Sequence, residues 1–135
     1  MEITEQKRGD VKIIGLRGRL DAETSPSVGK RLMNLLDQGE RRLVFDFSDL
    51  TYISSSGLRL LIEVARNLQK ANGKLALAGL SDHIREIFNI AGFTSLFAIY
   101  PTCDEAIAHA QSGSRGESKA SMPPDGSIPG GPVRS

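Results

Sequence analysis

The sequence predicts an α/β domain with a mostly parallel or mixed sheet that is flanked by helices. The first observation is that short apolar runs alternate with longer segments of helical periodicity after about residue 25. The second is a pair of strand-like segments at the start, joined by a turn signal. The third is a change of composition near residue 111. Together they give the expected order β-β-α-β-α-β-α-β-α, in which helices connect parallel strands.

The first two strands are expected to form a hairpin. The stretch EITEQKRGDVKIIGLRGRLD alternates weakly between polar and apolar residues and turns at Gly9-Asp10. Gly and Asp at adjacent positions favour the backbone of a tight hairpin turn. We therefore expect strands at about residues 2–7 and 11–18.

A first helix is expected after the hairpin. Ser25 followed by Pro26 is a typical N-cap and first-turn pair, because the serine oxygen accepts a backbone hydrogen bond and proline lacks an amide hydrogen that the first turn cannot use. Apolar residues then recur at helical spacing. Gly39 is expected to end the helix, since glycine readily adopts the left-handed conformation of a C-terminal cap.

A central strand and a second helix enclose a run of serines. Residues 43–47, LVFDF, form a short apolar run with two phenylalanines, which indicates a strand buried in a sheet. The stretch YISSSGL, residues 52–58, comes next. A helix is expected from the serines to Asn72, because apolar residues follow three and four apart. On its outer face, Arg59 and Glu63 have the i,i+4 spacing of an ion pair.

Four further elements are expected before the composition changes. They are a strand at 74–80, a helix capped by Ser81 or Asp82, a strand at 96–101 and a helix capped by Thr102. The predicted domain therefore covers residues 1–110. Residues 111–135 are rich in Gly, Ser and Pro, and we expect a disordered tail because few apolar side chains are present to offset the entropy of ordering.

Composition and charge predict a soluble cytoplasmic protein with no nucleic-acid or membrane partner. The formal net charge is +1, no basic stripe occurs and Trp is absent, so few groups could contact phosphates or stack on bases. No apolar run approaches the roughly 20 residues of a membrane-spanning helix. The start lacks the apolar segment of a signal peptide. A single cysteine excludes an intrachain disulfide, which fits a reducing compartment.

The serines Ser54, Ser55 and Ser56 allow two interpretations. One serine is sufficient to cap the helix, since its oxygen accepts a hydrogen bond from a backbone amide of the first turn. A helix start is also a favourable place for a phosphoryl group, because free amides and the positive end of the helix dipole lie there. The residues alone support the cap and the switch about equally.

The sequence does not assemble the residues of an enzyme, a metal site or a cofactor site. A nucleophilic serine on a strand-to-helix turn is usually framed as Gly-x-Ser-x-Gly, a pattern that is missing, and neither His83 nor His109 stands out as its base. Their wide separation also argues against a metal. Cys103 at a predicted helix start could be acidified, although a structural role is more common. We expect no enzyme activity, metal or cofactor.

The chain resembles the STAS-domain anti-sigma factor antagonists, also called anti-anti-sigma factors. The resemblance covers most of residues 1–110 in the same element order and includes LRGRLDAETSP and the run from LVFDFSDL to TCDEAI. Its most specific part is an apolar residue, Asp or Ser, Ser, a small residue, Gly and Leu after DxSxLxxI. Here that motif is ISSSGL, residues 53–58. A second part of the family pattern is Gly-Leu near residue 91. Here the stretch is NIAGFTSLF, in which Phe93 stands in place of the leucine.

The resemblance implies a phosphorylation switch at Ser55, the serine two positions before Gly57-Leu58. In the family, an anti-sigma factor kinase of the GHKL type phosphorylates this serine and a PP2C-type phosphatase resets it. The unmodified protein binds the kinase and frees a sigma factor, and the phosphorylated protein is released. Ser54 stands where the family frequently has Asp, so Ser54 or Ser56 could compete with Ser55 as the acceptor.

The resemblance also implies the surroundings of the switch. Asp21 matches an acidic residue that the family places near the phosphorylated serine, and partner contact is expected at residues 54–57, Leu58 and Arg59. The expected function is that of a bacterial phosphoprotein that regulates transcription by partner switching. The alternative is a STAS interaction module outside sigma regulation, in a transporter-associated or sensory complex. An intact serine at position 55 favours the switch.

Overall fold

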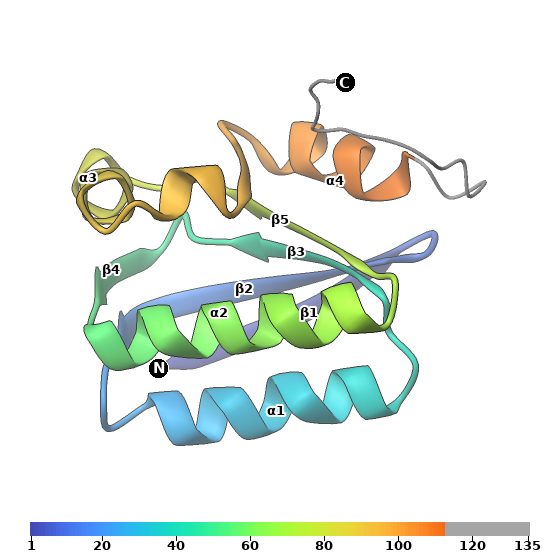
Figure 1. Cartoon of the computed structure of the whole chain (residues 1–135), viewed down its shortest axis with the longest axis horizontal. Coiled ribbons are helices and arrows are strands. Elements are labelled where there is room, and N and C mark those ends of the chain that lie inside the picture. The colour runs from blue at the N-terminus through green and yellow to red at the C-terminus, as the bar shows by residue number, and fades with distance from the viewer. Residues whose placement is uncertain (113–135) are drawn as a thin grey trace.

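The computed structural model describes residues 1–112, which form a six-stranded mixed sheet with helices on both faces (Figure 1). The strands are β1 Glu2–Arg8, β2 Val11–Leu20, β3 Arg42–Asp46, β4 Leu50–Ile53, β5 Lys74–Ala78 and β6 Ala98–Tyr100. The helices are α1 Ser25–Asp37, α2 Ser55–Lys70, α3 Asp82–Ile90 and α4 Cys103–Gln111, with a short 3₁₀ helix η1 at Phe93–Ser95. The predicted α/β class is confirmed.

The sheet is parallel except at its first strand. The strand order is β1-β2-β3-β5-β6, and β4 pairs with β2 beyond the end of β3. Strands β1 and β2 form the predicted antiparallel hairpin, with Arg8 opposite Val11 across the turn. The remaining pairs are parallel, because each pair is connected through a helix or a longer segment.

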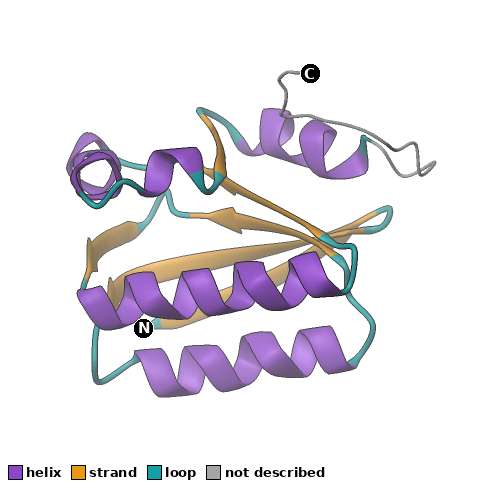
Figure 2. Ribbon diagram, in the orientation of Figure 1, coloured by secondary structure: helices purple, strands orange, loops and turns teal. Residues whose placement is uncertain are grey.

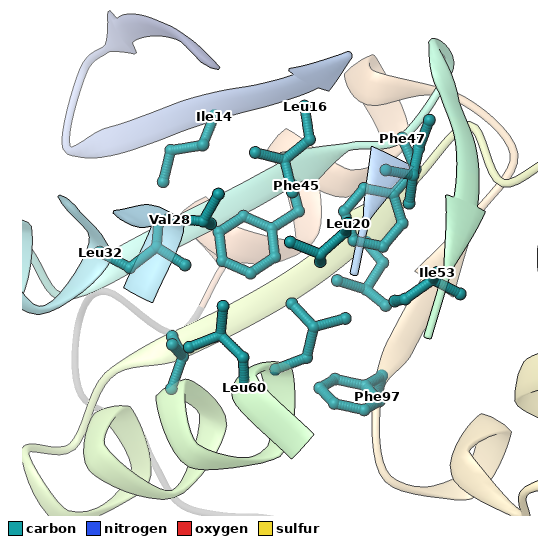
Figure 3. Close-up of a cluster of buried hydrophobic side chains, with 14 of the residues drawn as sticks. Ile14, Leu16, Leu20, Val28, Leu32, Phe45, Phe47, Ile53, Leu60 and Phe97 are labelled. Atoms are coloured by element: carbon teal, nitrogen blue, oxygen red, sulfur yellow. The ribbon is translucent and has the colours of Figure 1, made fainter. Parts of the chain in front are cut away.

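Helices cover both faces of the sheet, as Figure 2 shows. Alternate strand residues point to opposite faces. In β3, Leu43 and Phe45 join the larger core beneath α1 and α2, whereas Val44 joins a smaller cluster beneath α4. Figure 3 shows the larger core, in which Phe45 and Leu60 come from the sheet and from α2. Burial on both faces explains why the central strand is a continuous apolar run.

Strand β4 and helix η1 are additions to the predicted order. The sequence suggested one strand before the serines, but a turn separates β3 from β4, in which the Leu50 N–H donates to the Phe47 carbonyl over 3.0 Å. The Asp46 carboxylate fixes this turn by accepting from the Ser48 amide at 3.0 Å and from its hydroxyl at 2.6 Å. The chain therefore turns after β3, and β4 pairs with a later part of β2 than β3 does.

The start of α1 differs from the predicted Ser25 cap. The N-cap is Thr24, and Ser25 is the first helical residue. Asp21 explains the shift, because one of its carboxylate oxygens accepts from the Glu23 and Thr24 amides, both at 3.0 Å. Pro26 still lies in the first turn, as predicted. The Ser25 hydroxyl, which no longer caps the helix, is buried and has no hydrogen-bond partner among the described residues.

The C-terminal end of α4 is fastened to the sheet by two cations. Arg42 and Lys74 are paired residues at the first positions of β3 and β5. The Arg42 guanidinium donates to the Ala110 carbonyl, and the Lys74 ammonium donates to the Ser112 carbonyl over 2.7 Å. These cations stabilise the negative end of the helix dipole. The predicted tail, 111–135, lies outside the described residues except for its first two positions.

Within residues 1–112, no helix is both long enough and apolar enough to cross a bilayer.

Candidate phosphorylation site at the start of helix α2

The start of α2 is held by the ends of two neighbouring strands. Leu20, the last residue of β2, pairs with Ile53, the last residue of β4. One residue further along, the Ser54 amide donates to the Leu20 carbonyl over 2.9 Å. The serine run and the segment that begins at Asp21 therefore emerge side by side at one edge of the sheet.

Gly57 permits the close approach of α2 to this edge. It is buried, and a Cβ atom there would lie 2.9 Å from the Leu20 carbonyl oxygen and 2.9 Å from side-chain carbons of Leu20 and Ile53. Real Cβ atoms do not approach backbone oxygens so closely. The glycine in the SSSGL motif is thus required by packing, whatever the role of the serines.

The three serines have different environments. Ser54 is the N-cap, half-buried, and its Oγ accepts from the Gly57 amide over 3.3 Å. Ser55 is exposed, and its hydroxyl makes no hydrogen bond to another described residue. Ser56 is half-buried and lines a groove between α1 and α2. The cap needs only Ser54, so Ser55 is left available.

Helices α1 and α2 carry no acidic residue in their first turns, whereas α3 has Asp82 and α4 has Asp104 and Glu105. Carboxylates at these positions neutralise part of the positive end of a helix dipole. At α2 no side chain of the first turn supplies such a charge, and the first backbone amides have no helical partners. An anion on Ser55 would be stabilised there.

Asp21 supplies a fixed negative charge close by. Its pKa is held below the usual value by hydrogen bonds from the backbone amides of Thr24 and Glu23, with a further contribution from Arg19. The Arg19 Nε atom lies 3.6 Å from the second carboxylate oxygen. The carboxylate is therefore already engaged and ionised at neutral pH, and it belongs to the turn that precedes α1.

Arg19 and Tyr52 form a contact that the sequence did not reveal. The Arg19 guanidinium lies over the Tyr52 ring, 4.1 Å from its centre, in a cation–π arrangement. The two residues are partners in the β2–β4 ladder. Because no local pattern predicted β4, the proximity of Arg19 and Tyr52 could not be anticipated. They bring a cation to the edge from which α2 starts.

The two predicted contact residues lie differently. Leu58 is half-buried and packs against the larger core, so only part of its side chain is available to a partner. Arg59 is exposed and lines the groove between α1 and α2. The expected ion pair between Arg59 and Glu63 does not form: among the described residues, neither takes part in an ion pair.

The groove between α1 and α2 has a volume of about 480 Å³. In Figure 1 the two helices run side by side on the same face of the sheet. Ser56 and Arg59 lie on the α2 side of the groove, and Lys30 and Met33 lie on the α1 side. It opens beside the residues that start α2, so the exposed serine and the groove form neighbouring parts of one surface.

The other reactive side chains do not assemble with the serines. His83 is exposed on α3, and the His109 ring packs 5.3 Å from that of Tyr100, on the opposite face of the sheet from α2. Burial, and then the nearby Asp46 carboxylate, raise the pKa of the Cys103 thiol to about 11. That thiol is therefore protonated at neutral pH. Among residues 1–112, no cluster of three or more His, Cys, Asp or Glu could hold a metal.

The chain belongs to the STAS domain family, whose model matches residues 2–106. A Bordetella bronchiseptica protein that carries the name "Putative anti-sigma factor antagonist BtrV" is 37% identical over 108 residues, which cover 80% of this chain and 93% of that protein. An anti-sigma-B factor antagonist of Listeria monocytogenes is 28% identical over 99 residues, covering 73% and 86%. The predicted family is confirmed.

Solved structures show the same fold. The anti-sigma factor antagonist SpoIIAA in its unphosphorylated form matches 82% of this chain and 99% of its own, with a TM-score of 0.66 and 21% identity. The phosphorylated form of SpoIIAA, described as a Bacillus cell fate determinant, covers 82% and 100%, with a TM-score of 0.65 and 22% identity. At these identities the likeness establishes the fold alone.

Proposed function

We propose that this chain is an anti-sigma factor antagonist that switches partners through phosphorylation of Ser55. Unmodified, it binds an anti-sigma factor kinase of the GHKL type and so frees a sigma factor. Phosphorylated, it is released from the kinase, and a PP2C-type phosphatase resets it. The proposal places the chain in the bacterial cytoplasm, as a substrate of enzymes rather than an enzyme. Its support is the STAS family and the names of the relatives.

The observation that carries the proposal is the difference between Ser55 and its neighbours. Ser55 is exposed and its hydroxyl is unengaged within the described chain, whereas Ser54 caps α2 and Ser56 is half-buried beside the groove. A kinase needs a hydroxyl that can enter its active site while the substrate domain stays folded. Ser55 meets that requirement, since its modification leaves the Ser54 cap in place.

Phosphorylation at this position would change a surface and leave the fold intact. A phosphoserine adds a charge of about −1.5 to −2. At the start of α2 the dianion would meet unneutralised amides, so the modified helix loses no stabilising contact. SpoIIAA has been solved in both forms, and these match this chain with nearly equal TM-scores of 0.66 and 0.65. That similarity supports a switch without refolding.

The same dianion would weaken a contact centred on Ser55. A partner that packs on the free serine and on neighbouring side chains such as Arg59 must desolvate the phosphate or place its own charges against it. A change of about 3 kcal/mol in binding free energy is a factor of roughly one hundred in affinity. Partner exchange therefore requires only a local electrostatic change.

Tandem mass spectrometry of the chain from its native cells, with phosphatases inhibited, tests the proposal. We expect phosphate on Ser55. A Ser55→Ala variant should carry no phosphate at the motif, and the matched Ser56→Ala variant should still be modified. Phosphate on Ser54 or Ser56 in the parent chain would retain the switch and move the acceptor.

A pulldown with Ser55→Ala and Ser55→Asp variants tests the partner. The alanine variant should retain a GHKL-type kinase and the aspartate variant should lose it. A serine run that is never modified over a wide range of growth and stress conditions would contradict the proposal. Recovery of transporter or sensory subunits without a kinase would then favour a STAS module outside sigma regulation.

A further inference from the structure

We propose that the groove between α1 and α2 binds a small amphipathic anion, a carboxylate with an alkyl body of moderate length. Its volume of about 480 Å³ lies within the range of about 300–1,000 Å³ that is usual for small-molecule sites. The groove shares Ser56 and Arg59 with the surface around Ser55, and its other lining residues take no part in the proposed switch.

Half of the lining residues of the groove are apolar or small: Ala22, Pro26, Gly29, Met33 and Leu60. Of these, only Leu60 is buried, and Ala22 and Pro26 are exposed at the surface. Gly29 brings the helices together, because a Cβ there would lie 3.0 Å from the Leu60 Cδ1 atom. Met33 has an adaptable thioether side chain that fits apolar bodies of varied shape. An alkyl chain that packs against these apolar side chains is removed from water, which favours binding.

The groove also carries two cations without a carboxylate partner. Lys30 and Arg59 face it from α1 and α2, and neither forms an ion pair within the described chain. Neighbouring Arg31 is instead bound to Glu5 over 2.7 Å. Glu63 is the single acidic residue among the lining residues. The net positive charge of the groove selects an anion over a cation or a neutral molecule.

An unsatisfied hydroxyl lies at the same place. Ser25 lines the groove, is 9% exposed, and its Oγ has no hydrogen-bond partner. Buried hydroxyls are normally paired. In the proposed complex this hydroxyl donates to a carboxylate oxygen of the ligand, which supplies the partner that Ser25 lacks. Ser56 lines the groove from the opposite helix. A donor as deep as Ser25 favours a small ligand over a partner protein that docks across the rim.

Titration of the ¹⁵N-labelled full chain with octanoate, below its micelle concentration, tests the inference by NMR. Saturable shifts are expected for the amides of Gly29, Met33 and Leu60. Octanol, which has the same alkyl body and no charge, should bind about tenfold more weakly, since the interactions of both cations are lost.

Two variants and one control separate binding from folding. The double variant Lys30→Gln, Arg59→Gln should lower the affinity for octanoate by about tenfold. The control, Arg66→Gln with Lys70→Gln, removes the same charge from exposed positions of α2 outside the groove and should have little effect. Ser25→Ala should fold at least as stably as the parent, because its hydroxyl has no partner, and should weaken octanoate by about three- to tenfold.

Four results would overturn the inference. They are equal affinities for octanoate and octanol, an affinity unchanged in the Lys30 and Arg59 double variant, shifts centred on the exposed apolar side chains of Ile90 and Leu96, and tighter binding of an acidic amphipathic peptide than of octanoate by the same residues. The last would identify the groove as a protein-docking surface.

Discussion

Helices α2 and α4 lie on opposite faces of the sheet and begin in the same way, but their first turns differ in charge. Each has a hydroxyl N-cap: Ser54 accepts from the Gly57 amide over 3.3 Å, and Thr102 accepts from the Glu105 amide over 3.2 Å. Three residues after the cap, α2 has a buried glycine and α4 has an exposed glutamate. The Glu105 side chain also contacts the Thr102 hydroxyl at 3.0 Å.

The comparison separates two tasks of a helix start. The hydroxyl cap satisfies one backbone amide in both helices, so it serves stability alone. In α4, acidic residues of the first turn interact favourably with the positive end of the helix dipole. The first turn of α2 contains no acidic residue. The first turn of α4 therefore carries its own negative charge. The first turn of α2 has a capped amide and no acidic side chain, which suits the reversible arrival of a phosphate.

The largest expected effect on stability is at Gly57, the third residue of α2. Gly57→Val should destabilise the domain by about 1–3 kcal/mol, because the new side chain overlaps the Leu20 carbonyl and the Ile53 side chain. The matched Glu105→Val change in α4 should cost less than about 1 kcal/mol, since that position is exposed. Urea denaturation of both variants measures the difference. Equal costs would show that α2 can move away from the sheet edge.

Removal of the caps should have a smaller and similar effect in the two helices. Ser54→Ala and Thr102→Ala should each lower the free energy of unfolding by about 0.5–2 kcal/mol. In the Ser54→Ala variant, phosphate should still be found on Ser55, because the cap and the acceptor are separate residues. A Ser54→Ala chain of parental stability that loses its phosphorylation would assign Ser54 to the switch instead.

A carboxylate at the first helical position should have opposite effects in α2 and α4. Ser55→Asp should stabilise the domain by about 0.3–1 kcal/mol at low salt, through the helix dipole, and the gain should shrink in 1 M NaCl. Cys103→Asp should destabilise it, since that position is half-buried near Asp46. Thermal denaturation at two salt concentrations checks both. Destabilisation by Ser55→Asp would contradict an open charge site at α2.

The smallest expected effect concerns the last turn of α4 and its dependence on pH. Burial, and then Lys74, lower the pKa of His109 in the folded protein. Folding therefore favours the neutral ring: its stabilising effect is full above about pH 6.5 and is lost as the pH falls through the lowered value. Melting temperatures between pH 7.5 and 5 should fall less for His109→Gln than for the parent. Parallel curves would exclude this histidine as the cause.

The sequence predicted the elements that depend on local chemistry. The hairpin at Gly9, the cap at Thr102 and the helix after the serines follow from neighbouring residues, and all are present. The position of Ser55 at the start of α2 could likewise be predicted from the motif. Its exposure, and the use of Ser54 rather than another serine as the cap, needed the structure.

Features made by distant residues could not be predicted. Strand β4 has only four residues and exists because it pairs with β2, more than thirty positions earlier in the chain. The start of α1 is different, because it is a local feature that was predicted wrongly: Ser25 was expected to cap the helix, but the Asp21 carboxylate binds the Glu23 and Thr24 amides and moves the helix start. The groove between α1 and α2 depends on the distance between two helices, which no local pattern encodes.

The two cations that hold the end of α4 have a practical consequence for attaching probes to this protein. Arg42 and Lys74 stand at the first residues of β3 and β5, and α2 follows the last residue of β4. Since these strands are parallel to β2 or to one another, the end of α4 and the start of α2 lie at opposite ends of the sheet, and the two helices cover opposite faces (Figure 1). A dye or an immobilising handle joined at Ser112 would therefore leave the start of α2 uncovered.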